Sequence, residues 1–301
     1  MKILVCGARG FVGRHVSAAL RRAGHSVVEG VSTSAAAAGR PDAVHVDFVH
    51  DIRPEAWLPR LAGIGAVVNA VGLLRDSHSR PMAAVQAAAP IALFEACARA
   101  GMRRVVQVSA LGIDAADTPY ARTKREAEAA LLAHVAAGRL QGIALRPSVI
   151  FGRGGDSSAL FMNLARLPLL ILPGPVLRAR VQPVAVAELA EVAATLIGPR
   201  ADLTGHLECT GPVPVAMGDF IASLRRQGGH RAAPVLRLPD ALTALSARLG
   251  DRVPPSPWCS ETLAMLATDN VAPPEAFAAV LGRGATRFDA LVANAWRNAP
   301  D

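Results

Sequence analysis

Short apolar runs alternate with helical patterns through the first half of the chain. The runs occupy residues 2–6, 26–31, 43–46, 66–70, 104–108 and 142–146, and helical stretches lie between most of them. Apolar runs of this length, separated by helices, are typical of parallel strands joined by right-handed crossovers. The pattern therefore predicts an α/β fold with a doubly wound parallel sheet over about residues 1–150.

The amino-acid composition of the chain changes after Pro147. Prolines and glycines become dense, and five helical pieces follow at residues 186–197, 216–227, 239–249, 259–267 and 274–281. One further strand, at about residues 206–210, is predicted to return to the sheet. We interpret residues 151–301 as a smaller, mostly helical substrate region.

The first predicted strand ends in a glycine-rich turn. Residues 2–6 lead into Gly7-Ala8-Arg9-Gly10-Phe11-Val12-Gly13, and a helical pattern follows as far as Gly24. In a strand, turn and helix of this kind, glycines let backbone N–H groups approach a pyrophosphate at the helix N-terminus. The context predicts a Rossmann-type domain that binds a dinucleotide through residues 7–13.

Composition narrows the class of protein. The chain has 301 residues, is 51% apolar and carries four widely spaced cysteines without a C-x-x-C pair. It has no apolar run of the ~18 residues that a membrane-spanning helix needs, and its first strand leaves no room for a signal peptide. The cysteine and histidine spacing favours neither a metal site nor a disulfide framework, and we expect a cytoplasmic protein.

The formal net charge is +8. The basic residues are scattered in pairs rather than in a long run, which argues against nucleic-acid binding. Such a charge can attract anionic substrates or an acidic membrane surface, so peripheral membrane association stays open. The sequence does not indicate an oligomeric state.

The lone tyrosine has a rare neighbour. Of 32 lysines and arginines only Lys2 and Lys124 are lysine, and Lys124 lies four residues after Tyr120, the one tyrosine of the chain. On a helix this spacing places both side chains on one face. A compact ammonium beside a phenol is expected to lower the phenol's pKa from about 10 and to make it a proton donor and acceptor.

Other motifs follow in a fixed order. Asp47 comes after the third strand, Asn69-Ala70-Val71-Gly72 ends the fourth, Ser109 follows the fifth, and Arg146-Pro147-Ser148-Val149 ends the sixth. With the G-x-x-G-x-x-G turn and Tyr120-x-x-x-Lys124, this set resembles the extended and atypical short-chain dehydrogenases/reductases. The sequence is most similar to NAD-dependent epimerase/dehydratase-like proteins, in the subgroup that includes the nucleotide-binding accessory subunit of respiratory complex I.

The resemblance implies roles for single residues. Gly7, Gly10 and Gly13 would contact pyrophosphate, Asp47 and Phe48 would flank the adenine, and Ala70, Val71 and Gly72 would line the riboses. Lys124 would bind the nicotinamide ribose, Val149 would meet the carboxamide, and Pro147 would also contact the cofactor. Tyr120 would be the acid/base, and Ser109 would polarise a carbonyl or serve only as a turn residue.

One departure from the resemblance bears on activity. Active members carry an asparagine before the fifth strand that holds a proton-relay water, whereas Gln86 stands here. We expect an NAD(P)-dependent oxidoreductase that acts on a small carbonyl or hydroxyl substrate. A cofactor-binding protein without turnover and a sugar epimerase or dehydratase remain as alternatives.

The end of the second strand bears on cofactor choice. An acid there usually holds the ribose diol of NAD, but this strand ends in Ser32 and Thr33, with Glu29 further back. The two hydroxyls and Arg9 could hold a 2′-phosphate. We therefore expect NADP(H) to be preferred and NAD(H) to remain an alternative.

Overall fold

The computed structural model describes residues 1–102, 104–198, 202–253 and 258–297. Its centre is a seven-stranded sheet in which all neighbouring strands run parallel. In spatial order the strands are β11 (Gly205–Cys209), β6 (Gln141–Pro147), β5 (Arg104–Val108), β4 (Ala66–Asn69), β1 (Lys2–Cys6), β2 (Ser26–Val31) and β3 (Ala43–His45). The order changes direction between β1 and β4, which is the switch point of a doubly wound sheet. The predicted Rossmann-type α/β class is confirmed.

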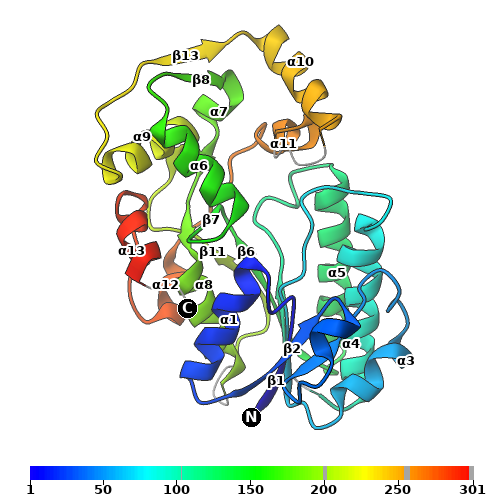
Figure 1. Ribbon diagram of the computed structural model, residues 1–301. Helices are drawn as coiled ribbons and strands as arrows, with labels where there is room; N and C mark the ends of the chain where they lie inside the picture. Colours follow the sequence, from blue (N-terminus) through cyan, green and yellow to red (C-terminus); the bar gives the residue numbers. More distant parts are fainter. Residues whose placement is uncertain (103, 199–201, 254–257, 298–301) are drawn as a thin grey trace.

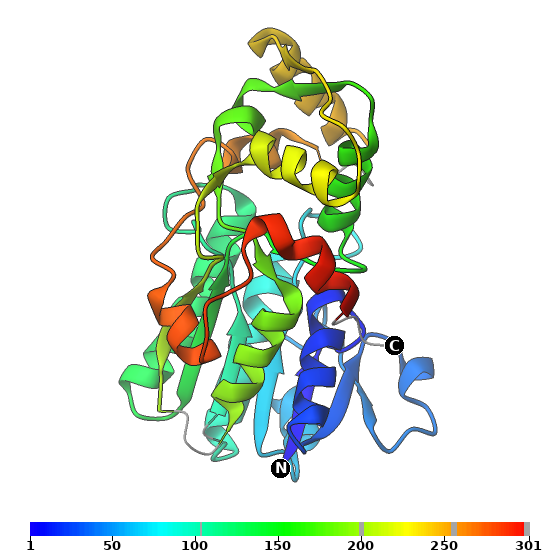
Figure 2. The same cartoon turned by 90° about the vertical axis from the view of Figure 1, so that its left-hand side faces the viewer.

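Helices cover both faces of the sheet (Figures 1 and 2). One face carries α1 (Phe11–Arg22), α8 (Val186–Ile197) and α12 (Glu275–Leu281), and the other carries α3 (Pro54–Trp57), α4 (Ala89–Arg99) and α5 (Pro119–Ala136). Successive side chains of a strand point to opposite faces. Ile3 and Val5 therefore enter the core with α1 and α8, whereas Leu4 and Cys6 enter the core with α3 and α4.

A second lobe stands over the carboxyl ends of the strands (Figure 1). Its helices are α6 (Asp156–Arg166), α7 (Gly174–Arg178), α9 (Met217–Gln227), α10 (Asp240–Asp251) and α11 (Ser260–Met265). Its short strands are β7 (Ile150–Phe151), β8 (Leu170–Pro173), β9 (Arg180–Val181), β10 (Val184–Ala185), β12 (Val215–Ala216) and β13 (Val235–Leu238). Phe151, Phe161 and Phe220 meet edge to face in its core, and α13 (Leu291–Arg297) packs against α9.

The second half of the chain also completes the sheet layers. β11 pairs with β6 at the edge of the sheet, where Leu207 lies opposite Leu145. α8 packs along α1, and Phe277 of α12 is fully buried in the same core. Residues beyond 151 therefore build both the second lobe and part of the sheet and of the helix layer on one of its faces.

Within the described residues, no helix has the length and apolar character needed to cross a lipid bilayer. The four cysteines are free and buried. No group of three or more His, Cys, Asp or Glu side chains that could hold a metal ion occurs in the part of the chain that the structure describes.

Candidate functional site

The glycine turn between β1 and α1 is closed by its own backbone. Gly7 adopts φ +74°, a left-handed conformation that favours glycine, and the Gly10 N–H donates to the Gly7 carbonyl at 2.9 Å. A Cβ added at Gly13 would lie 2.0 Å from the Gly7 oxygen. The first turn of α1 thus packs on the loop so closely that only glycine fits at position 13.

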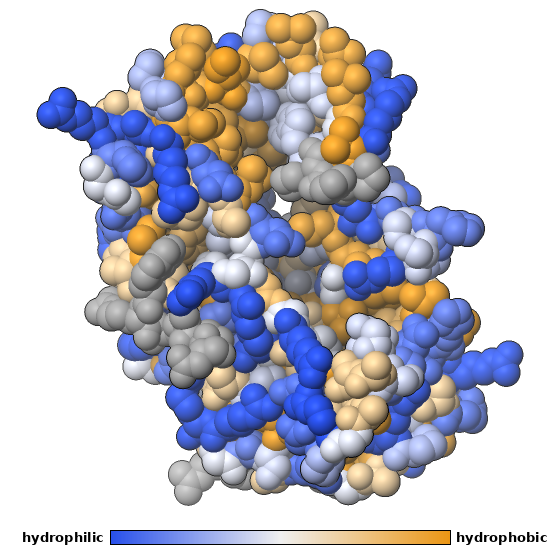
Figure 3. Space-filling model, viewed as in Figure 1, coloured by the Kyte–Doolittle hydropathy of each residue, from blue (hydrophilic) through white to orange (hydrophobic). Residues whose placement is uncertain are grey.

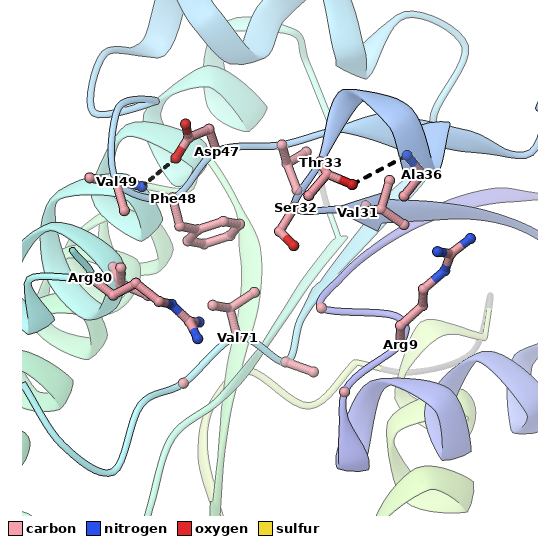
Figure 4. Close-up of a pocket in the computed structure, with 17 residues that line it drawn as sticks. Arg9, Val31, Ser32, Thr33, Ala36, Asp47, Phe48, Val49, Val71 and Arg80 are labelled. Atoms are coloured by element: carbon pink, nitrogen blue, oxygen red, sulfur yellow. Dashed lines mark hydrogen bonds between the residues drawn. The ribbon is translucent and has the colours of Figure 1, made fainter. Parts of the chain in front are cut away.

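A cavity of about 600 Å³ opens beside this turn, at the carboxyl ends of β1, β2, β3 and β4 (Figure 4). Ten of the residues predicted to hold the cofactor line it: Gly7, Arg9, Gly10, Ser32, Thr33, Asp47, Phe48, Ala70, Val71 and Gly72. Seven further lining residues were not predicted: Gly30, Val31, Ala36, Val46, Val49, Arg80 and Val85. The cavity has the position that Rossmann folds use for a dinucleotide.

Seven other predicted cofactor residues lie outside the lining of this cavity: Ala8, Phe11, Val12, Gly13, Lys124, Pro147 and Val149. Ala8 is buried in the core under the sheet, and Val12 packs against that core. The Phe11 ring contacts the His15 ring edge to face. It also packs against the loop before α6, where a Cβ added at Gly155 would lie 2.6 Å from the ring. Pro147 ends β6, and Val149 packs against the core of the second lobe.

Arginines surround the acid of the second strand. Glu29 accepts hydrogen bonds from Arg21 at 2.8 Å and Arg40 at 3.1 Å, and its carboxylate lies 3.6 Å from Arg9. Burial would raise the pKa of Glu29, but the hydrogen bonds from the two arginines outweigh it and lower the pKa below its usual value. The carboxylate of Glu29 is therefore ionised and already neutralised by the protein.

The side of the cavity next to β3 carries a fixed carboxylate. Asp47 accepts from the Val49 N–H at 3.0 Å and meets the His50 ring nitrogen at 2.8 Å. Burial alone would raise the pKa of Asp47. The contacts with His50 and Val49 have the larger effect, so this pKa lies below its usual value. The Phe48 ring stacks edge to face on Trp57 and faces the cavity in Figure 4.

Helix α5 brings Tyr120 and Lys124 to the same site. Thr118 caps this helix by accepting the Ala121 N–H, and Glu261 of α11 accepts the Tyr120 N–H at 2.9 Å. Lys124 Nζ lies 5.9 Å from the centre of the Tyr120 ring and donates to the Val108 carbonyl at 3.0 Å. A Cβ added at Gly72 would lie 3.4 Å from Lys124 Nζ, so the ammonium reaches a glycine that lines the cavity.

The pKa of Tyr120 differs from the expectation drawn from its neighbour. Burial raises the pKa of Tyr120 to about 12, and the negative charge of Glu261 adds to the effect. Burial also lowers the pKa of Lys124 to about 8, although Glu128 acts in the opposite direction. In the protein alone, desolvation of the phenol therefore outweighs the attraction of the ammonium for a phenolate.

The side chains of Ser109 and Gln86, near Tyr120 and Lys124, are already hydrogen-bonded to other groups of the protein. The Ser109 hydroxyl donates to Glu128 at 2.8 Å, and Glu128 is paired with Arg146. Gln86 lies on a π-helical turn, Ala84–Ala88, where its carbonyl accepts the Leu73 N–H and its amide donates to Thr123. π-Turns inside helices are frequent at functional sites. Glu128 and Glu261 were not predicted, because neither lies in a motif.

Comparison with known proteins agrees with this geometry. The chain resembles human epimerase family protein SDR39U1 (isoform 2) with NADPH at TM-score 0.71, with 19% identity, 99% of this chain and 100% of that chain covered. It resembles a UDP-glucose 4-epimerase of Thermus thermophilus in complex with NAD at TM-score 0.69, with 18% identity and 100% of each chain covered. MoeE5 in complex with UDP-glucuronic acid and NAD gives TM-score 0.71, 18% identity and 97% coverage of each chain.

At these identities the solved structures establish the fold. No curated protein sequence matches the chain significantly. A sequence profile of the NAD dependent epimerase/dehydratase family matches residues 3–172, which is more than half of the 301 residues. The chain therefore belongs to the NAD dependent epimerase/dehydratase family.

Proposed function

We propose that this protein is an NAD(P)-dependent oxidoreductase that transfers a hydride to or from a small carbonyl or hydroxyl substrate, with Tyr120 as acid and base. The observation that carries the proposal is the closeness of Lys124 to Gly72, where an added Cβ would lie 3.4 Å from Nζ. It joins the only tyrosine–lysine pair of the chain to the wall of the dinucleotide cavity. A packing tyrosine would need no such neighbour.

The residues present fit a nicotinamide dinucleotide. The Gly7–Gly10 turn would take the pyrophosphate, Phe48 and Asp47 would flank the adenine, and Lys124 would hold the nicotinamide ribose. The bound nicotinamide supplies or accepts the hydride. Tyr120 is protonated at neutral pH because its pKa is about 12, so it can give its proton to the substrate oxygen as the hydride reaches the carbonyl carbon. In the oxidative direction the positive charges of Lys124 and of an oxidised nicotinamide would favour the phenolate.

We infer a preference for NADP(H) from the rim of the cavity at β2. Ser32 and Thr33 line the cavity with Arg9. Glu29, the one acid of β2, is held by Arg21 and Arg40, which offsets its repulsion of a 2′-phosphate. Calorimetric titration with NADPH and NADH tests this inference, and tighter binding of NADH would contradict it.

A cofactor-binding protein without turnover is the second candidate. The Ser109 hydroxyl is committed to Glu128, and both ends of the Gln86 amide are bonded within the protein. The Ser109 proton is then not free for a substrate carbonyl, and the Gln86 amide is held in place by the protein itself. A sugar epimerase or dehydratase, as the family includes, would use the same cavity and the same pair.

One set of assays separates these functions. NADPH oxidation is followed with aldehydes, ketones and quinones, and UDP-glucose is incubated with NAD to detect epimerisation or dehydration. Turnover of a carbonyl substrate supports the oxidoreductase, and conversion of the sugar nucleotide supports the epimerase or dehydratase. Tight cofactor binding without either activity supports the second candidate. We further infer a cytoplasmic location, for which the free and buried state of all four cysteines is the supporting observation.

A further inference from the structure

The end of the second lobe farthest from the sheet exposes a cluster of large apolar side chains. Eight residues form this apolar tip: Leu167, Leu169, Ile171, Val235, Leu236, Leu242, Leu245 and Leu249. They come from β8, β13, α10 and the chain beside them, and each is between 38% and 57% exposed. In Figure 3 orange side chains gather at the same end, over the elements that Figure 1 labels β8, β13 and α10. A contiguous apolar surface of this kind marks an interaction site.

Helix α10 is oriented with its leucines outward. Leu242, Leu245 and Leu249 are about half exposed, whereas the small residues Thr243, Ala247 and Gly250 are buried. A Cβ at Gly250 would lie 1.9 Å from the Trp258 carbonyl oxygen, so the helix sits tightly on its inner face. A surface helix ordinarily turns its leucines toward the core. The three leucines join none of the described cores and are available to another surface.

Arginines are interleaved with the apolar tip. Residues 166–178 and 231–253, which contain it, hold six arginines and two aspartates, a net charge of +4 and half of the chain's formal charge. Arg178 and Arg237 come together over Gly174, where their side chains lie 3.2 Å and 2.9 Å from an added Cβ. Arg248 and Arg252 extend from the exposed side of α10 and the residue that follows it. The surface therefore combines apolar side chains with an excess of positive charge.

We propose that the apolar tip docks on an anionic lipid surface. Leucines of an amphipathic helix enter the boundary between headgroups and acyl chains, while arginines stay at the level of the lipid phosphates. Charge complementarity favours lipid over a second copy of this chain. A symmetric dimer through the tip would place Arg248 and Arg252 against the same positive surface of the partner. The proposal does not depend on the reaction that the protein catalyses.

Co-sedimentation of the full chain with vesicles tests the proposal. Vesicles of phosphatidylcholine with about 30% phosphatidylglycerol are compared with phosphatidylcholine alone, and we expect binding to the first to be at least about tenfold stronger. The double variant Leu242→Gln/Leu245→Gln should lose about tenfold or more in binding to the anionic vesicles. The double variant Arg248→Gln/Arg252→Gln should bind the anionic vesicles about fivefold or more weakly. Added salt should weaken the binding of the wild type in the same way.

Matched controls separate the tip from the rest of the surface. Ile52→Gln/Leu203→Gln removes two side chains that are 48% and 41% exposed elsewhere, and Arg22→Gln/Arg53→Gln removes two exposed arginines on the sheet domain. Both should bind vesicles within about twofold of the wild type. No binding of the wild type, or equal binding by the leucine variant, would overturn the proposal. So would analytical ultracentrifugation showing, without lipid, a dimer that the leucine variant dissociates.

Discussion

The ammonium of Lys124 donates a hydrogen bond of 3.0 Å to the backbone carbonyl of Val108, the last residue of β5. This bond holds a buried positive charge at the point where the sheet, α5 and the cofactor cavity meet. Burial of the charge lowers the pKa of Lys124 from 10.5 to about 8. A lysine placed there lowers the stability of the protein below that pH, a cost that is common at functional positions.

Lys124→Met should therefore stabilise the protein near neutral pH. The variant removes the desolvation cost but also the hydrogen bond to Val108, so we expect a net gain of about 2 kcal/mol in the free energy of unfolding. Between pH 8 and 10.5 the unfolded chain holds the lysine proton more tightly than the folded chain. The wild type thus gains stability as the pH rises through this window. Urea unfolding near pH 7 and near pH 9.5 measures the difference in the free energy of unfolding between Lys124→Met and the wild type. This difference should be smaller at the higher pH, and a difference independent of pH would contradict the assignment.

Tyr120→Phe should abolish turnover and leave the cofactor affinity nearly unchanged. The variant loses only the proton donor, and loss of one positioned acid typically costs about 10²–10⁴ in rate. Lys124→Arg should damage both quantities, because a planar guanidinium cannot replace a compact ammonium between a phenol and a ribose. Rates of NADPH oxidation and calorimetric Kd values for both variants are the measurements. An active enzyme indifferent to Tyr120→Phe would exclude Tyr120 as the acid.

Ser109→Ala distinguishes a hydroxyl that polarises the substrate from one that serves the protein. The hydroxyl proton is directed at Glu128 and the residue is buried, so we expect less than about a tenfold loss in kcat and a loss of about 1 kcal/mol in stability. A larger kcat loss with unchanged stability would show instead that Ser109 acts on the substrate. Thr195→Ala, which removes a hydroxyl on α8 bonded to its own helix, is the control for stability.

Ser32→Asp should convert the cofactor preference from NADP(H) to NAD(H). The new carboxylate at the end of β2 would accept the ribose hydroxyls and repel a 2′-phosphate. Charge-assisted hydrogen bonds of this kind correspond to about ten- to a hundredfold in affinity. Ser34→Asp adds the same charge two residues on, outside the cavity lining, and should change the ratio of NADPH to NADH affinity far less. Equal effects of the two substitutions would show that net charge alone is responsible.

Gly13→Ala should destabilise the cofactor turn. Its Cβ would overlap the Gly7 carbonyl, and a backbone atom cannot move aside as a flexible side chain can. We expect a loss of about 2 kcal/mol or more in the free energy of unfolding, together with weaker cofactor binding. Gly284→Ala meets no atom within 4 Å and needs no left-handed backbone, so its Tm should stay near that of the wild type.

Residue patterns were sufficient to predict the sheet and three helices of the second lobe, α9, α10 and α11, but not the short strand pairs of that lobe. The six apolar runs of the first half correspond to β1 through β6, because a strand buried on both faces reads as a continuous apolar stretch. The helix predicted at 186–197 coincides with α8. The pairs β7–β10, β9–β12 and β8–β13 were not predicted. These strands have two to four residues, too few for a period to be recognised.

The site was predictable where a motif reports backbone geometry. Gly7 and Gly10 could be identified from the turn that they form, and Gly72 from its position after β4. Contacts between segments that are distant in the sequence could not be predicted, because no motif marks them. Glu261, 141 residues from Tyr120, caps its helix, and Arg80 reaches the cavity from a loop without a motif. Burial of the phenol likewise depends on such contacts, so the raised pKa of Tyr120 in the protein alone was not predicted from the sequence.

The placement of α8 and α12 has a consequence for synthesis on the ribosome. When β1 through β6 have emerged, the face of the sheet that carries α1 still lacks α8, β11 and α12. Ile143 and Leu145 then stay in contact with solvent until residues 186–197 arrive, and the edge of β6 stays unpaired until residue 205. Phe277 and Leu281 close this core only after residue 281 has followed. Until then the segment up to β6 exposes the kind of apolar strand surface that makes partly folded chains prone to aggregation.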